Sequence, residues 1–296
     1  MDDAWVCIQR SPRRDLVADT GFALTAVGVD NLIREEGLEW SLWVPSQQHD
    51  EARRQLEQYR HDLAEAEARA AVPEIPPIDK GHYGIAGFLA VIWLVPVLQG
   101  YGILDQDAAR AGAMNAGAVM SGEWWRTITA LTLHGDFGHI LGNSGFGLVI
   151  GLMVGRNLGS GLGWLLVLAS GALGNGINAW LQADAFTAIG ASTATFAALG
   201  MVGAYVWQRG SQRAFGLRRS LAPLFAAFAL LAFTGVGGEN TDVVGHFTGF
   251  AAGGLIGLAA SGFAPERLTH RGQGYCGMAA IALVALSWGL ALLALA

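Results

Sequence analysis

Seven long apolar segments fill the chain from residue 83 onward, and they constrain its fold more than any other feature. They lie at about 83–101, 138–155, 161–181, 189–207, 220–237, 242–262 and 275–295. Most of them reach the roughly 20 residues that an α-helix needs to cross a bilayer. Only 14% of the residues are charged, whereas a soluble domain carries about 25%. The pattern therefore predicts a polytopic, all-α membrane protein.

The first 66 residues have a different character and predict a small soluble α+β domain. Alternating and helical patterns follow one another in the order βαββα. Strands are expected at 5–8 and 38–44, and helices at 15–27 and from about 46 to 69. Ser46 is the expected N-cap of the last helix. No catalytic constellation is visible in this domain, so we interpret it as a regulatory or interaction module.

Residues 67–82 are interpreted as a linker. Pro73, Pro76 and Pro77 stand close together there, and closely spaced prolines stiffen and extend a chain. The linker is the one clear domain boundary. It separates the domain 1–66 from a membrane part that continues to the last segment.

The arginines of the loops predict the orientation of the membrane part. The loops after the second, fourth and sixth segments carry seven of them: Arg156, Arg209, Arg213, Arg218, Arg219, Arg267 and Arg271. The other loops carry only Arg110 and Arg126. Positive charge is retained on the cytoplasmic side. We expect a protein of the bacterial inner (plasma) membrane, with the N-terminus in the cytoplasm and the C-terminus outside, and no signal peptide.

Charge and cysteine usage exclude several classes of protein. The net charge of −6 and the mixed charges of the first 80 residues argue against a nucleic-acid partner. The two cysteines, Cys7 and Cys276, have neither the spacing of a metal site nor that of a disulfide framework. We expect no metal and no cofactor. The expected partners are the lipid bilayer and other membrane proteins.

This orientation brings the unusual polar residues of three segments to the same face. The second, fourth and sixth segments all begin outside, and each carries its polar residues at that beginning. These residues are His134, His139 and Asn143; Ser192; and Asp242 and His246. Ionisable groups inside a membrane are costly and indicate a functional site. Ser192, His246, His139 and Asn143 are therefore expected to meet in one layer.

Small residues offer a way to bring two of these segments together. Gly245, Gly249, Gly253 and Gly257 recur every four residues on the sixth segment. Such a stripe lets two helix backbones approach closely. If the fourth and sixth segments pack along it, Ser192 and His246 come within hydrogen-bond reach.

A serine beside a histidine in this layer predicts nucleophilic catalysis. A histidine can take the proton of a serine hydroxyl and so activate it. The backbone amides of Ala191 and Ser192, with the side chains of His139 and Asn143, would supply donors for an oxyanion. Asp242 is expected to cap its helix rather than to orient the histidine. The pattern favours a Ser192–His246 dyad. The alternatives are an interhelical hydrogen bond for the pair and an interhelical amide contact for Asn143.

These residues resemble the rhomboid intramembrane serine proteases. The resemblance rests on His134-x4-His139-x3-Asn143, then Gly190-x-Ser192, then Gly245-His246-x2-Gly249-x3-Gly253, with Trp125-Arg126 in the first outer loop. It covers about residues 83–262 and implies a six-helix catalytic core there, with 263–296 as a loop and an added C-terminal helix. It also implies substrates that are membrane helices, cleaved near their outer ends.

The resemblance assigns further residues and shows one departure. Phe196 matches an aromatic ring that packs on the catalytic histidine. His134 either shapes the active-site loop or caps it, and Trp124, Trp125 and Arg126 are more often interface anchors than substrate contacts. The family usually has glycine after the serine, where this chain has Thr193. An alternative function is therefore a weak or inactive relative that binds membrane helices for quality control. A transporter ranks last, because no inverted repeat is visible.

Overall fold

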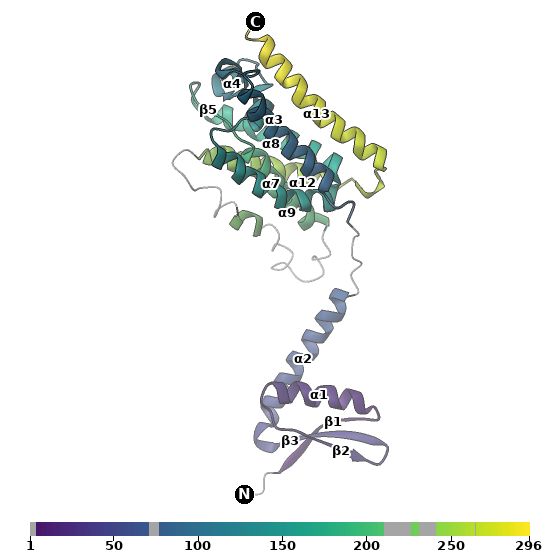
Figure 1. Cartoon of the computed structure of the whole chain (residues 1–296). Helices are drawn as coiled ribbons and strands as arrows, with labels where there is room; N and C mark the ends of the chain where they lie inside the picture. The colour runs from purple at the N-terminus through teal and green to yellow at the C-terminus, as the bar shows by residue number, and fades with distance from the viewer. Residues whose placement is uncertain (1–3, 71–76, 210–225, 231–240, 264) are drawn as a thin grey trace. The chain divides into compact units, whose positions relative to one another are not determined.

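The computed structural model describes residues 4–70, 77–209, 226–230, 241–263 and 265–296 (Figure 1). Two compact units follow one another along the chain, Met1–Glu74 and Ile75–Ala296. The division falls within the segment interpreted as a linker. Residues 71–76 of that segment lie outside the described residues.

The N-terminal unit has the expected βαββα order. It consists of β1 (Trp5–Ser11), α1 (Arg14–Ala26), β2 (Leu32–Glu36), β3 (Glu39–Pro45) and α2 (His49–Ala70). The strands form an antiparallel sheet in the order β1-β3-β2. Val17 and Leu24 of α1 pack on Leu42 and Val44 of β3, and all four side chains are fully buried. The alternating apolar residues of β3 thus bind the helix to the sheet.

The predicted N-cap of α2 is wrong. Ser46 begins a short 3-10 helix, η1 (Ser46–Gln48), and its backbone N–H donates to the Ala4 carbonyl, with an N–O distance of 2.8 Å. The α-helix begins only at His49 and continues to Ala70, into the segment interpreted as a linker. The 3-10 turn supplies the helix start that the sequence pattern assigned to a serine side chain.

Five helices of the second unit are long and apolar enough to cross a membrane. They are α3 (His82–Gly100), α7 (Phe137–Leu158), α8 (Ser160–Leu181), α12 (Val243–Ala260) and α13 (His270–Leu293). This count covers the described residues. The chain is therefore an integral membrane protein, mostly helical, with a small N-terminal sheet domain.

Two of the seven expected segments need separate comment. The fourth is helix α9 (Ser192–Arg209), which is long enough but less apolar than the five spans. Most of its residues are buried against other helices, so it has little contact with any surrounding solvent. The fifth segment, about 220–237, lies mostly outside the described residues; residues 226–230 are helical.

Helices α9 and α12 are in backbone contact along the predicted glycine stripe. A Cβ added to Gly249, Gly253 or Gly257 would overlap a backbone carbonyl oxygen of α9. The carbonyls concerned belong to Thr193, Ala197 and Met201. Gly245 is different, because a Cβ there would meet the side chains of Asp242 and Asn178 instead. Three of the four glycines thus serve the predicted contact.

The connection between α3 and α7 is folded rather than a plain loop. It holds α4 (Gln106–Gly112), β4 (Met114–Asn115), α5 (Ala116–Met120), α6 (Arg126–Thr129) and the 3-10 helix η2 (Ala130–Thr132). Strand β4 pairs with β5 (Thr187–Ala188), which lies just before Ser192. The connection is thereby joined to the segment that leads into α9.

Helix α13 is fixed near both of its ends. Near its start, the Gln273 side-chain oxygen accepts from the backbone N–H groups of Gly161 and Leu162, at 2.9 and 2.8 Å. Near its end, the Trp288 indole N–H donates to the Thr132 hydroxyl at 3.0 Å. The seventh helix therefore contacts both the α7–α8 turn and the α3–α7 connection.

Two of the loop arginines, Arg156 and Arg209, lie at the same end of the helices. The Arg156 carbonyl accepts from the Ile78 N–H at 2.9 Å. The Arg209 guanidinium pairs with Glu266 at 2.7 Å. Ile78 and Glu266 line one cavity, so these two arginine-bearing ends are neighbours. This arrangement fits the alternation that the loop charges predict.

Candidate functional site

Ser192 is the first residue of α9 and is half-buried. The turn before it depends on Gly190, whose φ is +131° and which is buried. The Gly190 N–H donates to the Ala130 carbonyl of η2 at 2.9 Å. Only glycine adopts such a φ readily. The turn therefore presents the serine at the helix start, where backbone N–H groups lack intrahelical acceptors.

The His139 ring lies against this turn. A Cβ built on Gly190 would stand 2.6 Å from His139 Nε2 and 3.6 Å from Ser192 Oγ. The imidazole and the serine hydroxyl thus flank the same point on the glycine. Helix α7 brings His139 there in its first turn, after Asp136, whose carboxylate caps the helix by accepting from the His139 N–H at 2.8 Å.

His246 lies in the first turn of α12 and is 7% exposed. Its ring packs on the ring of Phe196, with centroids 4.5 Å apart and an interplanar angle of 38°. Phe196 follows Ser192 by four residues, so the two share one face of α9. The histidine ring is therefore held beside the turn of α9 that begins with the serine.

Asp242 caps α12 as predicted. One carboxylate oxygen accepts from the Gly245 N–H at 2.8 Å, and the other accepts from the Asn178 side-chain amide at 2.6 Å. Both oxygens are thus used at the helix start. A cap of this kind is worth about 1 kcal/mol, and here it also ties α12 to α8.

Asn143 follows His139 by one turn on α7 and is 6% exposed. Its Nδ2 is buried and has no hydrogen-bond partner among the described residues. The residues on either side of it along this face contact the turn before α9 and the second turn of α9. His139 lies against Gly190, and the Phe146 ring lies 5.3 Å from the Phe196 ring. The face that carries the unpaired amide is therefore turned toward the start of α9.

Thr193 is accommodated by two glycines. Its side-chain methyl would lie 3.0 Å from a Cβ on Gly174 of α8 and 2.9 Å from one on Gly249 of α12. The residue is 5% exposed, and no described residue other than glycine has a positive φ. The β-branched side chain thus fills space between three helices, in an ordinary helical backbone.

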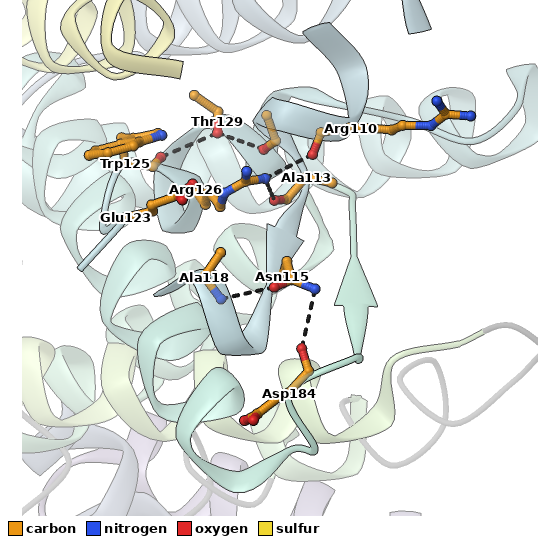
Figure 2. A network of polar contacts seen from close by, with 10 residues as sticks. Arg110, Ala113, Asn115, Ala118, Glu123, Trp125, Arg126, Thr129 and Asp184 are labelled. Atoms are coloured by element: carbon orange, nitrogen blue, oxygen red, sulfur yellow. Dashed lines mark hydrogen bonds and ion pairs between the residues drawn. The ribbon is translucent and has the colours of Figure 1, made fainter. Parts of the chain in front are cut away.

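Arg126 holds the α3–α7 connection together, and its place as an interface anchor stays a prediction. Its guanidinium pairs with Glu123 at 2.6 Å and donates to the carbonyls of Arg110 and Ala113 at 2.8 and 3.0 Å (Figure 2). The side chain is only 13% exposed. Backbone carbonyls that lack partners in an irregular segment attract such a buried donor.

Asn115 joins the same connection to the segment before α9. Its side chain accepts from the Ala118 N–H at 2.9 Å and donates to the Asp184 carbonyl at 3.2 Å (Figure 2). This bond reinforces the pairing of β4 with β5. The folded connection therefore fixes the approach to Gly190 and Ser192.

His134 lies just before α7, and its role in shaping or capping the active-site loop stays a prediction. Its ring meets the His139 ring edge-on, with centroids 5.0 Å apart. Burial, together with the neighbouring His139 imidazole, lowers the pKa of His134 from its ordinary value of 6.5 to about 4. The cap of α7 is Asp136. His134 is thus a neutral ring that supports His139 at neutral pH.

Two buried amides of α8 also belong to this region, and neither was among the residues predicted from the sequence. Asn178 is fully buried and donates to Asp242, and Asn175 donates to the Thr127 carbonyl at 2.9 Å. The signal in the sequence is a pair of amides three residues apart in an otherwise apolar segment. Such a pair indicates hydrogen bonds to other elements, because a buried amide needs a partner.

Comparison with known proteins agrees with this arrangement. Residues 121–263 match the family model described as the Rhomboid domain. Over 182 residues the chain is 28% identical to "Rhomboid protease GluP" of Bacillus subtilis (strain 168). The aligned region covers 60% of this chain and 33% of that protein. It is also 28% identical over 172 residues to "Putative rhomboid protease YdcA" of the same organism. That aligned region covers 58% of this chain and 84% of that protein. The match thus spans about a third of the length of GluP.

Proposed function

Because this chain belongs to the rhomboid family, we propose that it is a serine endopeptidase that cleaves the membrane-spanning segments of other proteins. Ser192 is the nucleophile and His246 is the base. The packing of the His246 ring on Phe196 carries this proposal, because Ser192 lies one turn before Phe196 on the same face of α9.

The proton transfer requires no third residue. His246 accepts the proton of the Ser192 hydroxyl as its oxygen attacks the scissile carbonyl, and returns it to the leaving amine. Asp242 takes no part, because its two oxygens hold the start of α12. The contact with Phe196 orients the imidazole in place of a carboxylate.

The oxyanion is stabilised from three directions. The backbone N–H groups of Ala191 and Ser192 lie at the start of α9, where the helix dipole favours negative charge. The Asn143 amide supplies a donor that is unpaired among the described residues, and the His139 imidazole lies beside the turn. Donors that are in place before the reaction lower the barrier most.

The substrate is a membrane helix, and the cleavage site lies toward the outer face of the bacterial inner membrane. This orientation rests on the loop arginines, with the N-terminal unit in the cytoplasm. Ser192 is half-buried, so the extended part of a substrate reaches it near one end of the helices rather than in the middle.

The proposal is tested by reconstituting the full chain in vesicles with a single-span substrate that has small and helix-breaking residues near its outer end. Ser192→Ala and His246→Ala are expected to lower the cleavage rate by about 10³-fold or more. Ser261→Ala and His61→Ala serve as matched controls, because Ser261 follows the far end of α12 and His61 is an exposed residue of α2 in the N-terminal unit. Equal cleavage by all variants would refute the dyad. Binding of substrate without cleavage by the wild type would support the quality-control alternative.

A further inference from the structure

A second feature of the membrane unit is a cavity of about 770 Å³ between α3, α8 and α13. It lies at the end where these three helices begin, away from Ser192. Its apolar walls come from the middle of the helices: Phe88, Val91, Trp164, Leu168, Ile281 and Val284. Each of these helices spans the membrane, so the cavity is bordered by spans and not by the N-terminal unit.

The other end of the cavity is polar. Asp79 lies there just before α3, Ser160 begins α8, and Thr269, His270 and Gln273 lie at the start of α13. Asp79 accepts from the Ser160 N–H and hydroxyl at 2.6 and 3.0 Å, and Gln273 is bonded to the α7–α8 turn. The polar groups are therefore fixed in place by the fold.

The change from polar to apolar follows the direction of the helices. On α13 the lining runs from His270 to Val284, which is about 21 Å at the helical rise of 1.5 Å per residue. One leaflet provides about 15 Å of hydrocarbon. The length and the polarity of the cavity thus match one lipid molecule, with its head at the helix starts and an acyl chain between the walls.

The charge of the lining selects among lipids. The described lining residues include two carboxylates, Asp79 and Glu266, and no lysine or arginine. Glu266 is paired with Arg209, whereas Asp79 accepts from the Ser160 N–H and hydroxyl. An anionic head group would meet the Asp79 carboxylate without a compensating cation in the lining. An ammonium head group would face it favourably, and a carboxylate oxygen can accept more than one hydrogen bond.

We propose that this cavity is a binding site for a phospholipid with an ammonium head group, of the phosphatidylethanolamine type. On the orientation given above, the lipid belongs to the inner leaflet. The lipid fills the space between the seventh helix and α3, so it joins α13 to the core where the helices themselves leave a gap.

Two glycines allow the cavity to be filled by substitution without steric overlap with the residues that line it. Gly87 of α3 and Gly274 of α13 both line the cavity, and a Cβ on either would meet nothing within 4 Å. Leucine at either position would fill the cavity, and it also favours a helix over glycine. Gly289 of α13 offers a matched control, since it is equally open and does not line the cavity.

The experiment is native mass spectrometry of the full chain in detergent with added palmitoyl-oleoyl phosphatidylethanolamine or phosphatidylglycerol. The wild type and Gly289→Leu are expected to retain one phosphatidylethanolamine. The double variant Gly87→Leu/Gly274→Leu should retain it about tenfold more weakly, and phosphatidylglycerol should bind the wild type about tenfold more weakly. Unchanged retention by the double variant, equal binding of both lipids, or occupation by detergent or by a second copy of the chain alone would overturn the proposal.

A second measurement does not depend on the double variant. Trp164 lines the cavity, so an acyl chain there is close to its indole ring. Brominated acyl chains quench tryptophan fluorescence. In vesicles of phosphatidylethanolamine with such chains, the tryptophan fluorescence lost by the wild type should exceed the loss in Trp164→Phe. The difference should disappear in Gly274→Leu, but not in Gly289→Leu. A difference that persists in Gly274→Leu would place the lipid elsewhere.

Discussion

Gly190 has the most restricted position of the described residues around Ser192. Its φ of +131° is a conformation that other residues rarely adopt. A Cβ there would also stand 2.6 Å from the His139 Nε2. Both the backbone turn and the histidine ring thus depend on the missing side chain, and the sequence motif alone did not show which of the two requires glycine.

We predict that Gly190→Ala lowers the cleavage rate by tenfold or more, because the backbone strain of about 1–3 kcal/mol and the displaced His139 both disturb the oxyanion donors. The cleavage assay in vesicles measures this loss. Gly176→Ala is the control, since a Cβ on Gly176 meets nothing within 4 Å. If Gly190→Ala cleaves at the wild-type rate, His139 and this turn have no role in catalysis.

Asn143 is the residue whose predicted role is most directly open to test. Its Nδ2 is buried and unpaired among the described residues, which is costly unless an acceptor arrives during the reaction. Asn143→Ala is expected to lower kcat by about 10²–10³-fold with little change in KM. Asn157→Ala, on the same helix and at its far end, should leave kcat unchanged. A change in KM alone would show an effect on substrate binding instead.

At the scale of the elements, the helices that could be predicted from the sequence are the long apolar ones. The apolar runs place α3, α7, α8 and α13 to within a few residues, because a span must be both long and apolar. The glycine period correctly indicates which helices touch. Residues 102–137 have no such period, so their short helices and the β4–β5 pair were not visible in the sequence. The role of Arg126 depends on carbonyls that only this fold places together.

The contact of α9 with α12 gives a sharp prediction at this scale. A Cβ on Gly253 would overlap the Ala197 carbonyl, whereas a Cβ on the adjacent Gly254 meets nothing within 4 Å. Gly253→Ala should therefore destabilise the protein by about 3 kcal/mol, and Gly254→Ala should be neutral or slightly stabilising. Unfolding in mixed detergent micelles measures both. Equal stability of the two variants would contradict the close backbone contact.

For the membrane unit as a whole, one ion pair links elements far apart in the chain. Arg209, at the end of α9, pairs with Glu266 in η4 (Pro265–Arg267), just before α13. The hydrogen bond from Arg209 lowers the pKa of Glu266 from its ordinary value of 4.5 to about 2. The ionised form is thus the one that the folded state favours.

The sign of the pH effect follows from this lowered pKa. The stabilisation from Glu266 is complete above pH 4.5 and is lost as the pH falls from there toward 2. The stability difference between the wild type and Glu266→Gln should be constant from neutral pH down to about 5 and should shrink at lower pH. Chemical unfolding at several pH values measures it, and other carboxyl groups cancel in the difference. A difference that grows on acidification would contradict the pairing.

The attachment of α13 at both of its ends also sets an order for biosynthesis. Helix α13 leaves the ribosome after the α7–α8 turn and after Thr132, the residues that Gln273 and Trp288 bind. Those parts of the membrane unit are therefore made before their partners exist. Their hydrogen bonds to Gln273 and Trp288 form only when α13 enters the membrane, so the α7–α8 turn and the α3–α7 connection reach their final state only after α13 has been made.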